Sequence, residues 1–188
     1  MMSQTEEKKK LRTEMKERAR GLSRDYCETA SRRICDRVTA DADYQQARVV
    51  FCFVGVGAEP DTRAILEDAL RSGKRLCVPR CIDKTTMEAV EIHNCDEDLE
   101  RGFYGLLEPK EGLASVPREE IEFGVIPCVS CDHDGNRLGH GRGYYDRYLE
   151  GMDFPCALIC FEKMTCGSGV IPVDEHDRKI ARVITDAE

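Results

Sequence analysis

Residues 48–79 read RVVFCFVGVGAEPDTRAILEDALRSGKRLCVP, and this stretch decides the fold. Residues 48–54 form an apolar run of strand length, which is typical of a strand buried on both faces. After a loop at 55–60, residues 62–71 carry apolar side chains on one helical face, and Gly73 ends that helix. Residues 75–79 form the next strand. Strand, helix and strand in this order predict a βαβ unit and therefore a parallel sheet.

The rest of the chain extends this α/β pattern in both directions. Residues 8–20 predict an amphipathic helix, and Ser23 is a suitable N-cap for a second one. Downstream, we predict strands at 87–93, 123–127, 155–161 and 181–185, a short helix at 144–149, and mostly loop at 97–117. Because no repeat or linker interrupts the chain, we expect one domain over residues 1–188, with N-terminal helices at about 8–40 and an α/β core at about 47–186.

Composition excludes several function classes. The 188 residues carry a net charge of −8, with 34% charged and 41% hydrophobic residues. This acidic balance argues against general binding to nucleic acid or anionic membranes. No run approaches the roughly 18–20 apolar residues of a membrane span, and the first residues lack the apolar centre of a signal peptide. We expect a cytoplasmic monomer with neither nucleic-acid nor membrane partners.

The chain has 11 cysteines. Their odd number disfavours a disulfide framework, as does the missing signal sequence. Several of them, such as Cys52 and Cys77, lie in apolar runs where a thiol acts as a small hydrophobe. Cys128 and Cys131 have the Cys-x-x-Cys spacing of a redox pair or of half a zinc site, but zinc would need a second pair. We expect reduced, structural cysteines, and the redox activity of Cys128 and Cys131 stays open.

The strongest candidate for a functional motif is the segment 134–150, DGNRLGHGRGYYDRYLE. Glycines at 139, 141 and 143 leave the backbone bare and free to adopt positive φ, and basic or imidazole side chains at 137, 140, 142 and 147 surround them. With a helix starting directly afterwards, this pattern favours a phosphate-bearing ligand, and Asp146 suits a magnesium ion. A plain strand-to-helix turn is the alternative. The spacing matches neither the dinucleotide fingerprint nor the phosphate loop of nucleotide-binding proteins.

Other single positions have a functional and a structural interpretation. Lys8 and Arg12 share a helical face, which can meet phosphate oxygens or simply be solvated. Glu59 follows the first strand of the sheet, at the edge where α/β proteins bind ligands. It can accept hydrogen bonds from an amino-pyrimidine, or it can merely begin the next helix. Asp177 can share a magnesium ion with Asp146, or belong to a solvated acidic turn.

Together these motifs resemble the 5-formyltetrahydrofolate cyclo-ligase family, from about residue 8 to residue 185. The strongest match is the segment 134–147. The basic helix at 8–20, the elements Glu59–Thr62 and Gly102–Pro109, and the closing Pro172–Asp177 match as well. Their order and spread make the resemblance more specific than the glycine motif alone.

The resemblance implies a three-layer α/β/α sandwich with a mostly parallel sheet. It implies a ligase that uses ATP and Mg²⁺ to cyclise 5-formyltetrahydrofolate to 5,10-methenyltetrahydrofolate, releasing ADP and phosphate, by phosphorylation of the formyl oxygen. Arg142 and Tyr144 would be catalytic, and Asp146 and Asp177 would bind magnesium. The implied ATP contacts are Lys8, Arg12, Arg137, Leu138, Gly139, His140, Gly141, Arg142, Gly143, Tyr144 and Tyr145. The implied folate contacts are Val54, Glu59, His140, Gly141, Arg142, Gly143 and Tyr144.

The chain departs from the family pattern in places. Met164 stands where many members carry Gln, and His140 and Arg142 replace commoner residues of the glycine motif. Two other function classes remain as alternatives. One is a non-catalytic folate- or nucleotide-binding module, which the intact set of Arg137, Asp146 and Asp177 disfavours. The other is a nucleic-acid-binding protein that uses the helix at 8–20, which the acidic net charge disfavours.

Overall fold

Helices open the chain, as the sequence predicts. The computed structural model describes residues 3–102 and 105–187. Helix α1 (Gln4–Arg20) starts earlier than expected, because Ser3 and Glu6 form a capping box. Helix α2 (Arg24–Ala40) begins after Ser23, whose side chain accepts a hydrogen bond from the backbone of Tyr26, so the predicted N-cap is confirmed. The short helix α3 (Ala42–Gln46) was not expected, and the side chain of Asp41 caps it.

The predicted βαβ unit is present and sets the centre of the sheet. It consists of β1 (Val49–Cys52), α4 (Arg63–Arg71) and β2 (Arg75–Cys81). Strands β1 and β2 are parallel, with Val50 beside Leu76. Three further parallel strands lie on the other side of β1, namely β7 (Phe123–Ile126), β10 (Cys156–Ile159) and β11 (Val183–Ile184). Beyond β2, the strands β3 (Met87–Ile92) and β6 (Ser115–Val116) run antiparallel, giving the order β11-β10-β7-β1-β2-β3-β6.

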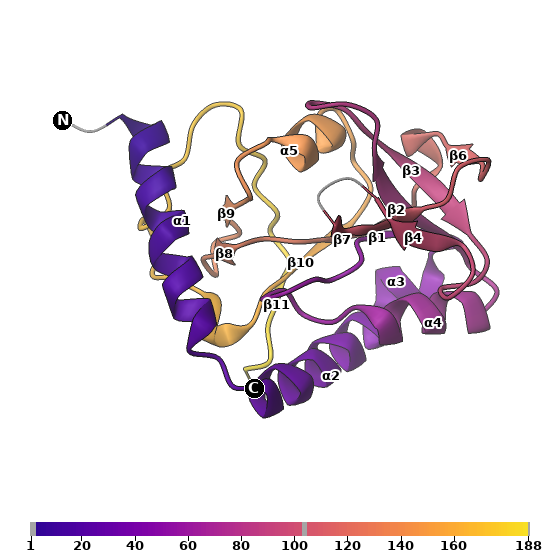
Figure 1. Ribbon diagram of the computed structural model, residues 1–188, viewed down its shortest axis with the longest axis horizontal. Coiled ribbons are helices and arrows are strands. Elements are labelled where there is room, and N and C mark those ends of the chain that lie inside the picture. The colour runs from indigo at the N-terminus through magenta and orange to yellow at the C-terminus, as the bar shows by residue number, and fades with distance from the viewer. Residues whose placement is uncertain (1–2, 103–104, 188) are drawn as a thin grey trace.

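Helices cover both faces of this sheet (Figure 1). Helices α2, α3 and α4 lie on one face, and Tyr44 of α3 meets Phe123 of β7 edge-on, with 5.7 Å between ring centroids. Helix α5 (Tyr144–Leu149) lies on the other face, where Tyr148 stacks on Phe51 of β1 at 5.0 Å. These ring contacts bury large apolar side chains on either side of the sheet. The expected three-layer α/β/α sandwich with a mostly parallel sheet is confirmed.

Short elements account for most differences from the sequence prediction. The segment expected to be mostly loop contains β4 (Leu99–Arg101) and β5 (Leu107–Pro109), which pair antiparallel, as well as β6. A hairpin of β8 (Ser130–Cys131) and β9 (Arg137–Leu138) leads into the glycine motif. Single turns of 3-10 helix follow at Arg118–Glu120 and Glu162–Met164. Strands of two or three residues are too short to leave an alternating pattern in the sequence, so periodicity does not find them.

Strand β2 also continues past the proline at which it was expected to end. Its pairing with β1 ends at Cys77, whereas its pairing with β3 runs on to Cys81. Over its last residues β2 therefore has a partner on only one side. A proline is tolerated there because its missing N–H can face the unpaired side.

The order of the strands marks a place for a ligand. The chain adds β2 on one side of β1 and β7 on the other, so the direction of winding reverses between β1 and β7. In open α/β sheets a crevice forms outside the carboxyl ends of the strands at such a point. None of the described helices combines the length and apolar character needed to cross a membrane.

Candidate functional site

A cavity of about 580 Å³ opens where the strand order reverses. Phe53 and Val54 follow β1, and Pro127 follows β7. Helix α1, the glycine motif, β5 and the adjoining ends of β2 and β3 contribute further lining residues. The cavity brings together every residue to which the family resemblance assigned a role. These are Lys8, Arg12, Val54, Glu59, Arg137, Leu138, Gly139, His140, Gly141, Arg142, Gly143, Tyr144, Tyr145, Asp146 and Asp177. Their individual roles remain predictions.

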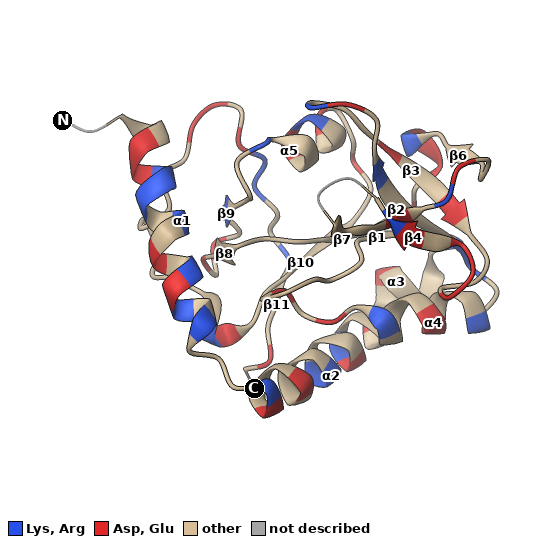
Figure 2. Ribbon diagram, viewed as in Figure 1, with Lys and Arg blue, Asp and Glu red and all other residues tan. Residues whose placement is uncertain are grey.

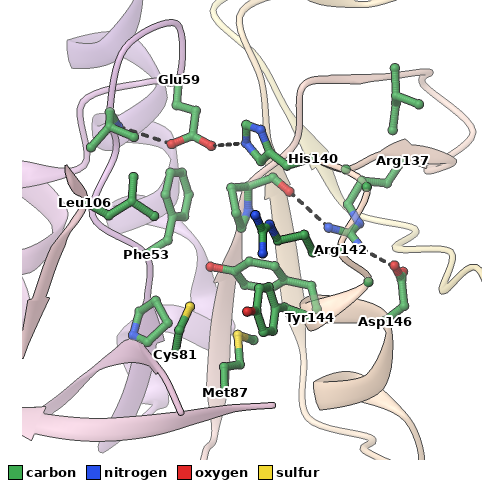
Figure 3. A pocket seen from close by; sticks show the side chains of 18 of the residues that line it. Phe53, Glu59, Cys81, Met87, Leu106, Arg137, His140, Arg142, Tyr144 and Asp146 are labelled. Atoms are coloured by element: carbon green, nitrogen blue, oxygen red, sulfur yellow. Dashed lines mark hydrogen bonds and ion pairs between the residues drawn. The ribbon is translucent and has the colours of Figure 1, made fainter. Parts of the chain in front are cut away.

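One half of the cavity is apolar. Figure 3 shows Phe53, Met87 and Leu106 around it, together with Cys81. Sequence analysis missed all four as site residues. Cys81 ends β2, so the rule that ligands bind at the carboxyl ends of parallel strands was a usable signal for it. Met87 and Leu106 reach the cavity through antiparallel segments whose position the sequence does not indicate.

Glu59 points into this half of the cavity (Figure 3). Its Oε2 accepts a hydrogen bond from the backbone N–H of Val56 at 3.1 Å, and its Oε1 lies 2.9 Å from Nε2 of His140. The Oγ1 of Thr62 holds the loop in place by donating to the carbonyl of Phe53 at 2.7 Å and accepting from the N–H of Gly55 at 3.0 Å. Glu59 therefore lines the cavity and does not cap α4, whose N-cap is Thr62.

A second carboxylate lies nearby and was not predicted as a site residue. Glu108 of β5 is buried at the cavity wall, and its Oε1 accepts a hydrogen bond from the backbone N–H of Cys81 at 3.2 Å. Gly102 makes room for it, because a Cβ at that position would lie 2.0 Å from Oε2 of Glu108. Burial, reinforced by the charge of Glu108, raises the pKa of Cys81 to about 11. Residues 103 and 104 of the predicted element Gly102–Pro109 lie outside the described residues.

The glycine motif joins the two halves of the cavity. Gly141 and Gly143 have φ values of +95° and +65°, and Gly143 is the N-cap of α5. A side chain there would be strained and would place its Cβ 2.7 Å from the guanidinium of Arg147. The expectation of positive φ does not hold for Gly139, which continues directly from β9. Arg147 turns away from the cavity and donates to the carbonyl oxygens of Thr85 and Arg142.

The other half of the cavity is lined by cations. The side chain of Arg137 is only 5% exposed, and its Nη2 lies 2.6 Å from Oδ1 of Asp146. Its guanidinium also lies over the ring of Tyr145, 5.6 Å from the centroid. Arg12 reaches in from α1 and donates from Nε to the carbonyl of Gly139 at 2.7 Å, and burial lowers its pKa. Figure 3 shows Arg142 between these groups and the apolar half.

Lys8 anchors α1 at the rim of this half. Its Nζ lies 2.8 Å from Asp174 and 2.5 Å from Asp177. Burial opposes the positive charge of Lys8, but the hydrogen bonds to both carboxylates outweigh it and raise the pKa of Lys8. The hydrogen bond from Lys8 lowers the pKa of Asp174 in turn. Basic and acidic residues are mixed along α1 (Figure 2), and of its basic residues Lys8 and Arg12 line the cavity.

The two predicted magnesium ligands suit a hard cation. Asp146 and Asp177 line the same half of the cavity, and each uses one carboxylate oxygen for its contacts with the protein. Oδ1 of Asp146 bonds Arg137 and the backbone of Arg178, and Oδ2 of Asp177 bonds Lys8 and the backbone of Asp174. Among residues 3–102 and 105–187, their second oxygens have no hydrogen-bond partner. Mg²⁺ is commonly held by one or two carboxylates together with substrate phosphates and water, so this donor set fits.

The fold and this site define a ligand-binding α/β protein with an apolar, acid-containing pocket joined to a cationic one. Comparison with known proteins makes the class specific, since the model of the 5-formyltetrahydrofolate cyclo-ligase family matches residues 4–186. The chain belongs to this family and is an enzyme of the ligase class.

Several relatives support the assignment. The chain is 32% identical to the mouse 5-formyltetrahydrofolate cyclo-ligase, over 94% of this chain and 92% of the mouse protein. It is 25% identical to the Escherichia coli K12 enzyme, over 93% and 97% of the two chains. The fold is similar to that of the Aquifex aeolicus 5,10-methenyltetrahydrofolate synthetase, with a TM-score of 0.84 at 23% identity over 96% of this chain and 90% of that chain.

Proposed function

We propose that this enzyme couples ATP hydrolysis, with Mg²⁺, to the cyclisation of 5-formyltetrahydrofolate to 5,10-methenyltetrahydrofolate, releasing ADP and phosphate. One observation carries the proposal: a single cavity joins an apolar half containing Glu59 to a half lined by Lys8, Arg12 and Arg137. A reduced folate needs the first environment and a triphosphate needs the second. The glycine motif at 139–143 lies where the two ligands would meet.

The folate would be held through its pterin ring. The carboxylate of Glu59 has two oxygens that match the ring N–H and the exocyclic amine of an amino-pyrimidine, and Phe53 and Met87 offer apolar contact for the ring. The hydrogen bonds from Val56 and His140 fix the direction of this carboxylate before the folate arrives. Val54 lines the same pocket.

The chemistry requires activation of a formyl oxygen, which is a poor leaving group. In the proposed reaction this oxygen attacks the γ-phosphoryl group of ATP, and ADP leaves. Nitrogen 10 of the folate then attacks the resulting imidoyl phosphate, the ring closes, and the oxygen departs with phosphate. Phosphoryl transfer depends mainly on alignment and charge neutralisation. Arg12, Arg137 and Arg142, with the backbone N–H groups of the glycine motif, would supply both.

Tyr144 and the two aspartates complete the proposed machinery. The hydroxyl of Tyr144 donates to the carbonyl of Asp83 at 2.6 Å, which holds the ring at the boundary between the two halves. The side chain of Tyr144 would keep the formyl group in line with the phosphoryl group. Asp146 and Asp177 would hold Mg²⁺, which neutralises phosphate charge when it is bound.

The direct test follows the methenyl product by its near-ultraviolet absorbance, with purified protein, ATP, Mg²⁺ and 5-formyltetrahydrofolate. Arg142→Ala should lower kcat by roughly 100- to 1000-fold, by analogy with the loss of one oxyanion donor. Arg101→Ala is the matched control, because it removes an exposed guanidinium that does not line the cavity. Folded protein that binds both ligands but forms no product would contradict the proposal and favour a non-catalytic binding module.

A second pair of variants tests the folate half separately. Glu59→Gln should raise KM for the folate by about tenfold or more while changing KM for ATP little, because it weakens a charge-assisted hydrogen bond of about 1.5–3 kcal/mol. Glu97→Gln, an exposed acid outside the cavity, is the control. If Glu59→Gln raised KM for ATP as much as KM for the folate, Glu59 would not be a specific contact of the folate. Sedimentation and cell fractionation would test our further proposal of a cytoplasmic monomer.

A further inference from the structure

Three cysteine thiols meet at the β8–β9 hairpin, outside the residues that line the cavity. The Sγ atoms of Cys128, Cys131 and Cys160 all lie within 4.8 Å of one another. Cys128 follows β7, Cys131 belongs to β8, and Cys160 follows β10. Their exposures are 5%, 0% and 2%, so the cluster is closed to solvent. Within the described part of the chain, no other group of three or more potential metal ligands comes this close together.

The cluster goes beyond what the Cys-x-x-Cys spacing indicated. That spacing offers two ligands, and a zinc site was disfavoured because a second cysteine pair was missing. The fold supplies a third sulfur from a strand neighbouring β7, since β10 pairs with β7 and brings Cys160 beside Cys128. The thiol of Cys128 points toward the carbonyl of Ile159, the residue before Cys160, at 3.6 Å.

Proximity changes the acidity of these thiols. A thiol buried alone resists ionisation, as at Cys77, where burial raises the pKa to about 12. In the cluster, hydrogen bonds from Cys128 and Cys160 lower the pKa of Cys131 instead. Donating to its neighbours raises the pKa of Cys128. Three buried sulfurs this close together form a compact set of donors, and a metal ion can replace their protons.

We propose that Cys128, Cys131 and Cys160 form a binding site for one thiophilic d10 metal ion, Zn²⁺ or Cu⁺. Thiolates select such ions over Mg²⁺, which prefers oxygen. With zinc–sulfur bonds of about 2.3 Å, the thiolates of a tetrahedral site lie about 3.8 Å apart. The observed sulfurs need to approach by about 1 Å at most, which small side-chain rotations provide. Cu⁺ is satisfied by three thiolates, whereas Zn²⁺ would take a fourth donor.

An ion bound by the three thiolates would connect the strands that support the glycine motif. Cys131 lies opposite Arg137 in the β8–β9 hairpin, and Arg137 lines the cavity. Binding at the cluster would therefore fix β7, β8 and β10 relative to one another and hold the strand that carries Arg137. The site is structural in character, since its ligands are buried and do not reach the cavity.

The test uses the reduced, metal-free full chain and two probes, Zn²⁺ and Cu⁺, each in competition with a chromophoric chelator and without oxygen. We expect one ion per chain, and affinity lowered at least 100-fold in Cys131→Ala and Cys160→Ala. The control is Cys77→Ala, which removes an equally buried cysteine outside the cluster. The bound ion should raise the unfolding temperature of the wild type and the control but not of the cluster variants.

X-ray absorption of the loaded wild type makes the test independent of whether the variants fold. A coordination shell of three sulfurs at about 2.3 Å supports the site. A shell dominated by oxygen or nitrogen overturns it, as does equal binding by the cluster variants and the control, or binding of neither ion. The ion that binds with the higher affinity, Zn²⁺ or Cu⁺, is the metal that the site prefers.

Discussion

The buried ion pair of Arg137 and Asp146 should dominate the stability of the site. Nη2 of Arg137 lies 2.6 Å from Oδ1 of Asp146, with side-chain exposures of 5% and 23%. The remaining contacts of Arg137 are weak: its Nη1 is 3.4 Å from the carbonyl of Pro127, and its Nε has no partner among the described residues. Asp146 is therefore the group that compensates the buried charge. Asp146→Asn removes the negative charge and keeps the shape.

The expected cost follows from burial. Removing one partner of a buried ion pair costs about 3–5 kcal/mol, because the other charge stays behind. Asp146 is partly exposed, and asparagine can still accept a hydrogen bond from Arg137, so the lower end of about 3 kcal/mol applies. For a chain of this length, each kcal/mol shifts Tm by about 2–4 °C, so the expected loss is about 6–12 °C.

The assay is urea unfolding without nucleotide or magnesium. The control is Asp153→Asn, which removes the same charge from an exposed position nearby and should change the free energy of unfolding by less than about 0.5 kcal/mol. The double variant Arg137→Met with Asp146→Asn contains no buried charge, so it should recover at least about 1 kcal/mol relative to the sum of the single variants. The ion pair does not stabilise the site in this way if Asp146→Asn loses no more stability than Asp153→Asn. The same conclusion follows if the losses from Arg137→Met and Asp146→Asn simply add in the double variant.

Two further predictions concern the segments that frame the cavity. Thr62→Val removes the donor to the carbonyl of Phe53 and leaves the N–H of Gly55 without its acceptor, so urea unfolding should show a loss of about 2 kcal/mol, with a raised KM for the folate as the loop carrying Glu59 loosens. An unchanged stability would show that Thr62 does not hold this loop. Lys8→Gln should cost up to about 1 kcal/mol near pH 6. Because the pKa of Asp174 is lowered in the folded state, that difference should disappear as pH falls below about 4, and a difference constant down to pH 3 would contradict the ion pair.

The centre of the fold could be predicted because its signals are long. The apolar run at 48–54 and the amphipathic segment at 62–71 each bury a full element, and the structure has β1 and α4 there. What the sequence did not indicate was the direction of β3, which turns back along β2 and pairs antiparallel. A strand of this length has the same pattern of side chains in either direction, and only the tertiary context decides between them.

From the residues alone, the site could be predicted best where they are close in sequence; the distant Lys8, Glu59 and Asp177 kept two interpretations until the family resemblance joined them. The segment 134–150 contains Arg137, Arg142 and Asp146, so one motif located this part of the cationic half. Glu108 and Cys160 were missed because each meets residues that are distant in sequence. Glu108 does so through its hydrogen bond from the end of β2, and Cys160 through the pairing of β10 with β7. A single sequence without the strand order does not show such neighbours.

The charges of the cationic half explain how the proposed site can exist before its ligands arrive. Lys8 pairs with Asp177, and Arg137 pairs with Asp146, so both carboxylates have a cationic partner before any ligand binds. With Arg12 and Arg142 added, four positive charges stand against Asp146, Asp177 and Asp174, the last of which shares Lys8 at the rim, so positive charge is in excess. On the proposed function, this excess of positive charge would favour the anionic nucleotide. On the same proposal, Asp146 and Asp177 would hold the ion, which would supply the positive charge that these carboxylates need if Lys8 turns toward phosphate.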